Sequence, residues 1–391
     1  MVEKLLKGSP RFYAWIGFLL IFIAAAAGWY CYEQAFDNVH VGAGRDVSWG
    51  IHISHFTYFV GIAASAVVLL LPVYFHGFYP FRRVAILGEF MAFAAVTMAM
   101  LFIMMDIGVP QRVMNVAFHP TPNSMMFMDM LVLFGYTILN IVLGWIGLRC
   151  ERHGTEPERW VKVAIYVAIL WAFSIHTVTA FLYAGLAGNG YWMTSILAAR
   201  FLASAFCSGP ATLLLLLLLL HRLTGFDPGR QAVKTLALIT TYAMCVNVFF
   251  FCLEKFTAYY SGVPGLVAPS KFMFTGSGAE GAWLHYLMVP AALCAIISLV
   301  LLIPSKLRNN EKILPFALGS LLVATTVDKG VAIMIGGFTP NKFGTITVYS
   351  PTFSEIFLTL GIYAVGLLLL SCAWKVVLEV KKEAGTFELQ Q

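Results

Sequence analysis

The polar residues that could do chemistry gather between residues 104 and 130, in the segment MMDIGVPQRVMNVAFHPTPNSMMFMDM. Asp106 comes just before Gly108 and Pro110, which together end a helix, and Arg112 follows. The other polar side chains of the segment are Gln111, Asn115, His119, Asn123 and Ser124. In a chain that is otherwise largely apolar, such a set predicts a binding or proton-exchange site at the edge of a membrane. The alternative is a structural loop in which Arg112 pairs with Asp106.

Asp106 is the first candidate for proton exchange. It ends its helix, where the backbone dipole disfavours negative charge, in a place partly removed from water. A carboxyl group in such a place can pass protons to and from a ligand. His52 and His55 lie three residues apart and share one face of the preceding helix at the same end. A lone histidine in a helix bundle is more often a hydrogen-bonded core residue, but two histidines near Asp106 favour a function.

A second polar set leads from Asp106 towards the other side of the membrane. Its members are Glu89 and Thr97 on one expected helix and Tyr136 and Asn140 on the next. Together they could carry protons from the cytoplasm towards Asp106. The structural alternative is that Glu89 pairs with Arg82 or Arg83.

The composition of the chain places it in a membrane. Of its 391 residues, 60% are hydrophobic and only 11% are charged, whereas soluble domains carry about 25% charged residues. The net charge of +6 lies in short loops between apolar runs, so it does not indicate nucleic-acid binding. Seven scattered cysteines form no CxxC or CxxCH motif. This argues against covalent haem, iron–sulfur or zinc ligation within this chain.

Ten apolar runs are long enough to cross a bilayer. They lie near residues 12–36, 50–76, 82–107, 125–148, 159–187, 195–221, 231–256, 282–304, 313–337 and 352–379. The first run follows a basic start and could be mistaken for a signal peptide, but its length is that of a membrane helix. We therefore predict an all-α polytopic membrane protein with one integral membrane domain over residues 1–391.

The distribution of basic residues predicts the orientation. Alternate connections and both chain ends hold 18 of the 25 Lys and Arg residues, which puts both termini in the cytoplasm. The longer connections lie on the outer side, at residues 37–49, 108–124, 257–281 and 338–351. None of them is long enough for a separate domain, so a protein that binds outside must be another subunit.

Several charged residues fall within the expected helices, where each costs about 2.5–3.5 kcal/mol on insertion scales. They include Arg200, Glu254, Lys255, Asp328 and Lys329. Adjacent residues point about 100° apart on a helix, so Glu254 is not expected to pair with Lys255. Pairing between helices is the favoured interpretation for this group.

Three segments resemble the NrfD/PsrC family, the quinone-interacting membrane subunits of polysulfide reductase-type complexes. They are WGIHISHFTYFVGIAASAV (49–67), DIGVPQRVMNVAFHPTPNSMMF (106–127) and SIHTVTAFLYAGLAGNGYWMTSILAARFLASAFCSGPA (174–211). The resemblance covers roughly residues 45–380 in hydropathy. The ten-helix length is similar to the DsrP-like and HmcC-like subunits of that family, which belong to sulfite-reduction-associated and related redox complexes.

This resemblance implies two four-helix bundles, about residues 50–187 and 195–337, flanked by the first and last helices. It implies a menaquinone site near the outer face of a prokaryotic cytoplasmic membrane, facing a ferredoxin-like iron–sulfur subunit. Further expected partners are a multihaem cytochrome c and other membrane subunits. The candidates for quinone binding or proton exchange are His52, His55, Asp106, Arg112, Ser124, His176, Tyr183 and Arg200.

Two other functions compete with a quinone subunit that has no metal centre of its own. Nine histidines make a haem b-binding cytochrome conceivable, but His52 and His176, the main pair within a bundle, lie at different depths. Intramembrane charges and two similar halves would suit an ion-coupled secondary transporter. Against a transporter, the polar groups gather near the outer edge and no helix is visibly broken at mid-membrane.

Overall fold

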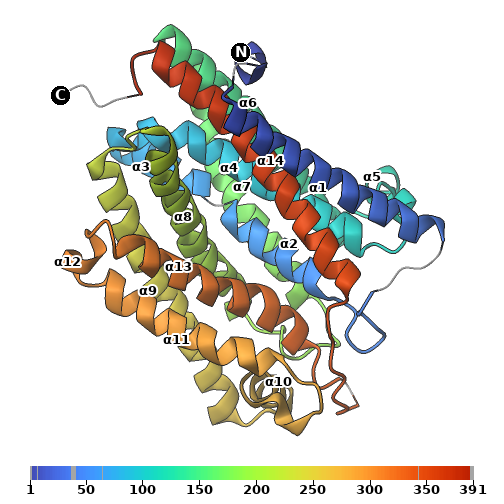
Figure 1. The fold of residues 1–391 in the computed structure, drawn as a ribbon. Helices are drawn as coiled ribbons and strands as arrows, with labels where there is room; N and C mark the ends of the chain where they lie inside the picture. Colours follow the sequence, from blue (N-terminus) through green and yellow to red (C-terminus); the bar gives the residue numbers. More distant parts are fainter. Residues whose placement is uncertain (1, 7, 37–40, 64, 342, 388–391) are drawn as a thin grey trace.

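The computed structural model describes residues 2–6, 8–36, 41–63, 65–341 and 343–387 (Figure 1). Over these residues the chain contains helices and loops without strands, and ten helical segments are long and apolar enough to cross a membrane. This confirms the predicted all-α polytopic fold. The segments are Pro10–Ala35 (α1), Ile51–Ile62 with Ser65–His76 (α2, α3), Arg82–Asp106 (α4), Met125–His153 (α6), Arg159–Ala184 (α7), Ile196–Thr224 (α8), Arg230–Ser261 (α9), Leu284–Leu302 (α11), Leu314–Thr325 with Thr326–Gly336 (α13, η5) and Phe353–Glu383 (α14).

The remaining helices are short and lie outside these spans. They are Val2–Leu6 (η1), Tyr79–Phe81 (η2), Pro110–Arg112 (η3), Asn115–Phe118 (α5), Pro264–Thr275 (α10), Gly276–Gly278 (η4) and Ser305–Arg308 (α12). Glycines in the left-handed backbone conformation end three of the long helices: Gly154 follows α6 (φ 63°), Gly225 follows α8 (φ 76°) and Gly262 follows α9 (φ 64°). A residue with a Cβ would be strained there, so these glycines set where the three helices end.

The long helices pack in two groups. In one group α4 contacts α2, α3 and α6, and α6 contacts α7; in the other α8 contacts α9 and α13, and α11 contacts α13. The groups meet where α2 packs on α8 and η5, and where α7 packs on α8. Figure 1 shows α14 crossing the first group beside α1, with α9, α11 and α13 on the opposite side. The α4–α14 contact brings the C-terminal helix to the N-terminal group.

Alternating helices give the molecule two distinct ends. The loop-rich end holds residues 41–49, 107–124, 185–195, 262–283 and 337–352 except 342. The basic end holds the short Lys- and Arg-rich connections, and both marked chain ends lie on that side in Figure 1.

The expected helix over residues 50–76 is interrupted near its middle. α2 ends at Ile62, Ala63 is in a turn, and α3 begins at Ser65. The phenol of Tyr136 on α6 donates a hydrogen bond to the Ala63 carbonyl (3.1 Å), which satisfies a backbone group at the break. Residue 64 lies outside the described residues and Ile51–His76 form one candidate span, so the expectation that no helix is broken at mid-membrane stays a prediction. A second irregular segment, η5, is π-helical, a form often found at functional sites.

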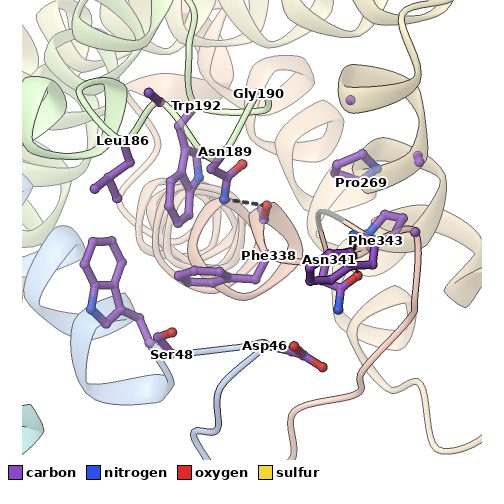
Figure 2. Close-up of a pocket in the computed structure, with 18 of the residues that line it drawn as sticks. Asp46, Ser48, Leu186, Asn189, Gly190, Trp192, Pro269, Phe338, Asn341 and Phe343 are labelled. Atoms are coloured by element: carbon purple, nitrogen blue, oxygen red, sulfur yellow. Dashed lines mark hydrogen bonds between the residues drawn. The ribbon is translucent and has the colours of Figure 1, made fainter.

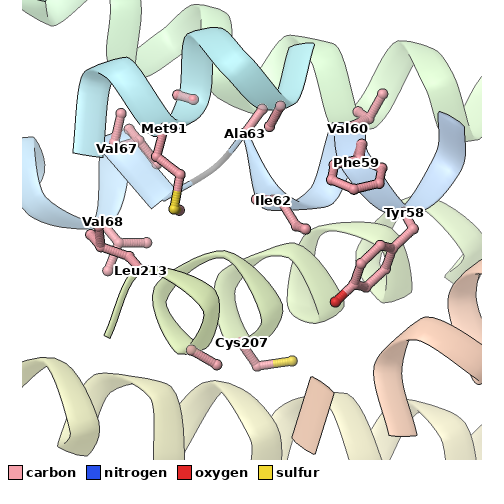
Figure 3. Close-up of a cluster of buried hydrophobic side chains, with 14 of the residues drawn as sticks. Tyr58, Phe59, Val60, Ile62, Ala63, Val67, Val68, Met91, Cys207 and Leu213 are labelled. Carbon is pink, nitrogen blue, oxygen red and sulfur yellow. The ribbon is translucent and has the colours of Figure 1, made fainter. Parts of the chain in front are cut away.

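Close packing across the two groups depends on small residues. Figure 3 shows buried side chains of α2, α3, α4 and α8 interdigitating around the break, among them Ile62, Val67 and Leu213. A Cβ added to Gly209 on α8 would lie 2.9 Å from the backbone nitrogen of Ser65. Inside a membrane the hydrophobic effect does not hold helices together, so close van der Waals contacts of this kind stabilise their packing.

Candidate functional site

Five residues lie at the loop-rich end, where α2, α4 and α14 come together. We call His52, His55, Asp106, Tyr349 and Glu355 the rim cluster. His52 and His55 come from the first turns of α2, Asp106 ends α4, Tyr349 precedes α14, and Glu355 lies in its first turn. The helices thus place the two histidines and the carboxylate at the same end, as the sequence predicted. The two residues near α14 were not expected.

Both histidine rings are held in fixed orientations. His52 Nε2 is 3.3 Å from the carbonyl oxygen of Glu355, and His55 Nδ1 is 2.7 Å from the carbonyl oxygen of Ile51. The His55 ring stacks on Phe102 of α4 with 5.2 Å between centroids. His55 Nε2 has no partner within the described chain and remains available to a ligand.

The carboxyl of Asp106 is half-buried, and no described residue hydrogen-bonds to it or forms an ion pair with it. The Glu355 carboxylate lies near enough to repel it electrostatically. Arg112 is exposed and forms no ion pair in the described chain. The structural alternative, an Asp106–Arg112 pair, is therefore wrong. Asp106 retains its full capacity to bind or exchange a proton.

Tyr349 joins the loop before α14 to α2. Its hydroxyl accepts a hydrogen bond from the backbone N–H of Ile51 (3.0 Å). A Cβ on Gly50 would lie 2.5 Å from that oxygen, so only glycine allows this approach. Burial, reinforced by the charge of nearby Glu355, raises the pKa of Tyr349. The phenol therefore keeps its proton and can donate it in a hydrogen bond.

A cavity of about 970 Å³ opens at the loop-rich end (Figure 2), and none of the rim-cluster residues lines it. We call it the end cavity. Trp49 and Trp192 stack at its wall with 5.7 Å between centroids, and Phe338 meets Trp192 edge-on at 4.8 Å. Figure 2 shows Asn189 pointing to the backbone after η5, where its side chain donates to the Gly337 carbonyl (2.8 Å).

Tyr183 lies behind the aromatic wall of the end cavity. It is fully buried, its ring packs on Trp49 at 5.5 Å, and its hydroxyl is 2.6 Å from that of Thr57 on α2. Trp49 is three residues before His52. Trp49 therefore connects the end cavity, which residues of both helix groups line, with Tyr183 and with the start of α2.

Arg200 is committed to a buried ion network in the second helix group. It donates to Glu254 of α9 and to Asp328 of η5. Lys255 Nζ lies 3.1 Å from Glu254 and 3.0 Å from the hydroxyl of Tyr191. The expectation that Glu254 cannot pair with Lys255 was wrong, because a lysine side chain is long enough to bend back. Two cations and two carboxylates balance each other here.

Glu89 lies at the other end of the first helix group. It lines a cavity of about 390 Å³ at the basic end, is 5% exposed, and forms no hydrogen bond or ion pair with a described residue. Arg82 pairs with Glu156 instead (3.0 Å), so the proposed pairing of Glu89 with an arginine is wrong.

These features agree with the comparison to known proteins. Residues 40–341 match the family described as polysulphide reductase, NrfD. The chain belongs to the NrfD family. The match begins just before α2 and ends after η5, so it covers both helix groups and leaves out α1 and α14.

Relatives of this NrfD-family chain are membrane subunits of reductases. It is 24% identical over 393 residues to a putative dimethyl sulfoxide reductase membrane subunit of Halobacterium salinarum, covering 91% of this chain and 88% of that one. It is also 24% identical to the Hdr-like menaquinol oxidoreductase integral membrane subunit of Archaeoglobus fulgidus, covering 76% and 73%. The solved bd oxidase of Geobacillus thermodenitrificans contains a chain of similar fold, with a TM-score of 0.57 at 11% identity over 86% and 96% of the chains.

Not every expected residue of the NrfD-family chain joins the rim cluster. Ser124 precedes α6 and makes no side-chain cap, and Thr97 bonds only to the carbonyl of Phe93 (2.9 Å). His176 lies seven residues before Tyr183 on α7, about two turns or roughly 10 Å deeper.

Besides Glu355, sequence reasoning overlooked two other buried acids of the NrfD-family chain, Glu33 of α1 and Asp129 of α6. Asp129 of α6 is 3% exposed and accepts a hydrogen bond from Thr179 of α7 (2.7 Å). A single carboxylate within the apolar run that begins at Met125 was the signal that could have revealed it.

Proposed function

We propose that this chain is the quinone-interacting membrane subunit of a respiratory electron-transfer complex, and that menaquinone exchanges electrons and protons at the rim cluster. The observation that carries this proposal is the half-buried carboxyl of Asp106, which has no hydrogen bond or ion pair with a described residue and lies at the same end of its helix group as His52 and His55. Menaquinone takes up or releases protons at its two carbonyl oxygens as it gains or loses electrons. A membrane residue that exchanges those protons must be free of internal ion pairs, as Asp106 is.

The residues of the rim cluster divide this work. Asp106 holds or releases the proton, and His55 offers its free Nε2 as a hydrogen-bonding group. Stacking on Phe102 keeps the His55 ring in place. Tyr349 stays protonated and fixes the start of α2 through Ile51. The side chains of His55 and Asp106 are partly exposed, and both residues belong to helical segments apolar enough to span a membrane, which supports entry of a lipid-soluble ligand from the bilayer.

The electron partner in this proposal is a ferredoxin-like iron–sulfur subunit that covers the end cavity. The open cavity, and Phe343 at its edge with 85% exposure, favour a protein covering this surface. Basic residues at the opposite end favour an orientation with both termini in the cytoplasm of a prokaryotic cell. The resemblance to DsrP-like and HmcC-like subunits favours a complex linked to sulfite or sulfate reduction, with a multihaem cytochrome c as a further partner.

We also propose that protons reach the rim cluster from the basic end. Glu89 receives them from the cavity that it lines. Asn140 donates to the Tyr136 carbonyl (2.8 Å), and the Tyr136 phenol bonds to Ala63 at the helix break. These groups continue the line of polar side chains from Glu89 into the first helix group.

Asp106→Asn tests the proposal in the assembled complex. The amide keeps the size of the carboxyl and cannot ionise, so menaquinol-linked turnover should fall by about 10²-fold or more, the scale of losing one acid–base group. Glu280→Gln, which neutralises an exposed carboxylate at the same end, should change nothing. Normal turnover in well-assembled Asp106→Asn complex would remove this residue from the mechanism.

A further inference from the structure

A second polar site lies between the two helix groups, at the depth of the helix break. We call Ser65 of α3, His176 of α7, Ser208 of α8 and Lys329 of η5 the central site. All four side chains are at most 2% exposed. None of them lines the end cavity or the cavity of Glu89, so the central site is separate from the features above.

The side chains of the central site have few partners. Both ring nitrogens of His176 and the hydroxyls of Ser65 and Ser208 have no hydrogen-bond partner in the described chain. Lys329 Nζ has three donor hydrogens, yet its one hydrogen bond is a long one to the Phe201 carbonyl (3.3 Å). Buried polar groups are nearly always satisfied, by protein or by internal water. The central site therefore has the capacity to bind water between its members.

Three members of the central site lie near the C-terminal end of α2. A Cβ on Gly61 of α2 would lie 2.8 Å from Lys329 Nζ and 3.5 Å from Ser208 Oγ. The hydroxyl of Tyr183 on α7 bonds to a side chain of α2 one turn before Gly61 (2.6 Å), and His176 lies about two turns deeper on α7. His176 is also close enough to Lys329 for the ammonium charge to act on it.

Lys329 has no counter-charge. The adjacent residue Asp328 forms an ion pair with Arg200, in the network where two cations and two carboxylates neutralise each other. The helices α2, α10, α11 and α13, which pack against η5, contain no acidic residue, and neither do α7 and α8. The titratable groups close enough to Lys329 to interact with its charge are His176 and Cys207. The ammonium lies over the Phe201 ring, 5.0 Å from its centroid, but no carboxylate of the described chain pairs with it, so a permanent charge there would be costly in the membrane.

We propose that Lys329 and His176 share one exchangeable proton through bound water, and that this pair is a proton-loading site between the two helix groups. The proton moves from the Lys329 ammonium to a ring nitrogen of His176, leaving a neutral amine and an imidazolium, so the charge of the pair is conserved. The pair takes up and releases this proton during turnover at the rim cluster. Only this coupling between the pair and turnover rests on the proposed function.

Isotope-edited infrared spectroscopy of the full chain in detergent tests the shared proton directly. His176→Gln identifies the His176 bands by their loss. At fixed neutral pH, Lys329→Met should convert the His176 signal to imidazolium, because the proton has no lysine to return to. Lys329→Arg should convert it to neutral imidazole, because a guanidinium does not give up its proton. Lys271→Met, which alters an exposed lysine of α10, should leave the spectrum unchanged. A His176 signal that is identical in all lysine variants would overturn the proposal.

Proton release per electron in vesicles then tests the coupling. Lys329→Met and His176→Gln should each lower this ratio, and the double variant should show the same loss as each single variant, since both belong to one site. An unchanged ratio, or losses that add, would refute the coupling. If wild-type vesicles do not oxidise menaquinol, the proposed function fails, while the infrared result still decides whether the proton is shared.

Discussion

Removing the positive charge of Arg200 should strongly destabilise the fold. The arginine is 2% exposed and holds the carboxylates of Glu254 and Asp328. In Arg200→Met, Glu254 keeps Lys255 as a partner, whereas Asp328 loses the only ion-pair partner it has in the described chain. Breaking a buried pair on one side costs about 3–5 kcal/mol. The free energy of unfolding in mixed micelles should therefore fall by about 4 kcal/mol.

A second variant separates charge from packing. Arg200→Met combined with Asp328→Asn leaves a balanced Glu254–Lys255 pair, so most of the lost stability should return. Arg82→Met is the matched control, because Arg82 and Glu156 form an exposed pair (48% and 68%) that is worth about 0–1 kcal/mol. A loss below about 1 kcal/mol in Arg200→Met, or no recovery in the double variant, would refute the reasoning.

Three further predictions concern other parts of the chain. Glu89→Gln should slow proton uptake from the basic side by about tenfold or more, as expected for a lost proton carrier. Arg82→Met, a change at the same cavity, should leave the rate of uptake unchanged, and a trapped pH dye in vesicles measures both rates. A cysteine at Ala117, in a variant without the natural cysteines, should react with a membrane-impermeant thiol reagent only from outside, and labelling from the cytoplasm would reverse the orientation. The purified chain, separated from partner subunits, should carry no haem, and a Soret band in its absorption spectrum would contradict this.

The sequence was sufficient to predict the membrane spans and to place three residues of the rim cluster at one edge of the membrane. Runs of apolar residues measure the depth of each residue in the bilayer, so His52, His55 and Asp106 could be assigned to a common edge. Hydropathy does not report the direction in which a side chain faces around its helix. For that reason Arg200 could not be matched to its two carboxylates.

Long-range packing explains what the sequence did not predict. Glu355 lies 303 residues from His52 along the chain, and it reaches the rim cluster only because α14 packs on α4. The break between α2 and α3 is equally hidden, because Ala63 and its neighbours are compatible with a regular helix. Tyr136 stabilises the break from another helix, and no local pattern encodes that contact.

The pairing of α1 with α14 has a consequence for biosynthesis. α1 packs mainly on α14, to which Trp15 and Trp29 donate hydrogen bonds at Ser371 (3.1 Å) and Ser354 (3.0 Å). About 320 residues separate the end of α1 from the start of α14, so at 5–20 residues per second a ribosome needs about 15–60 s to deliver the partner. During that interval α1 must remain in the bilayer surrounded by lipid, or be held by an insertion factor. α1 can therefore reach its packed position only after α14 has been synthesised.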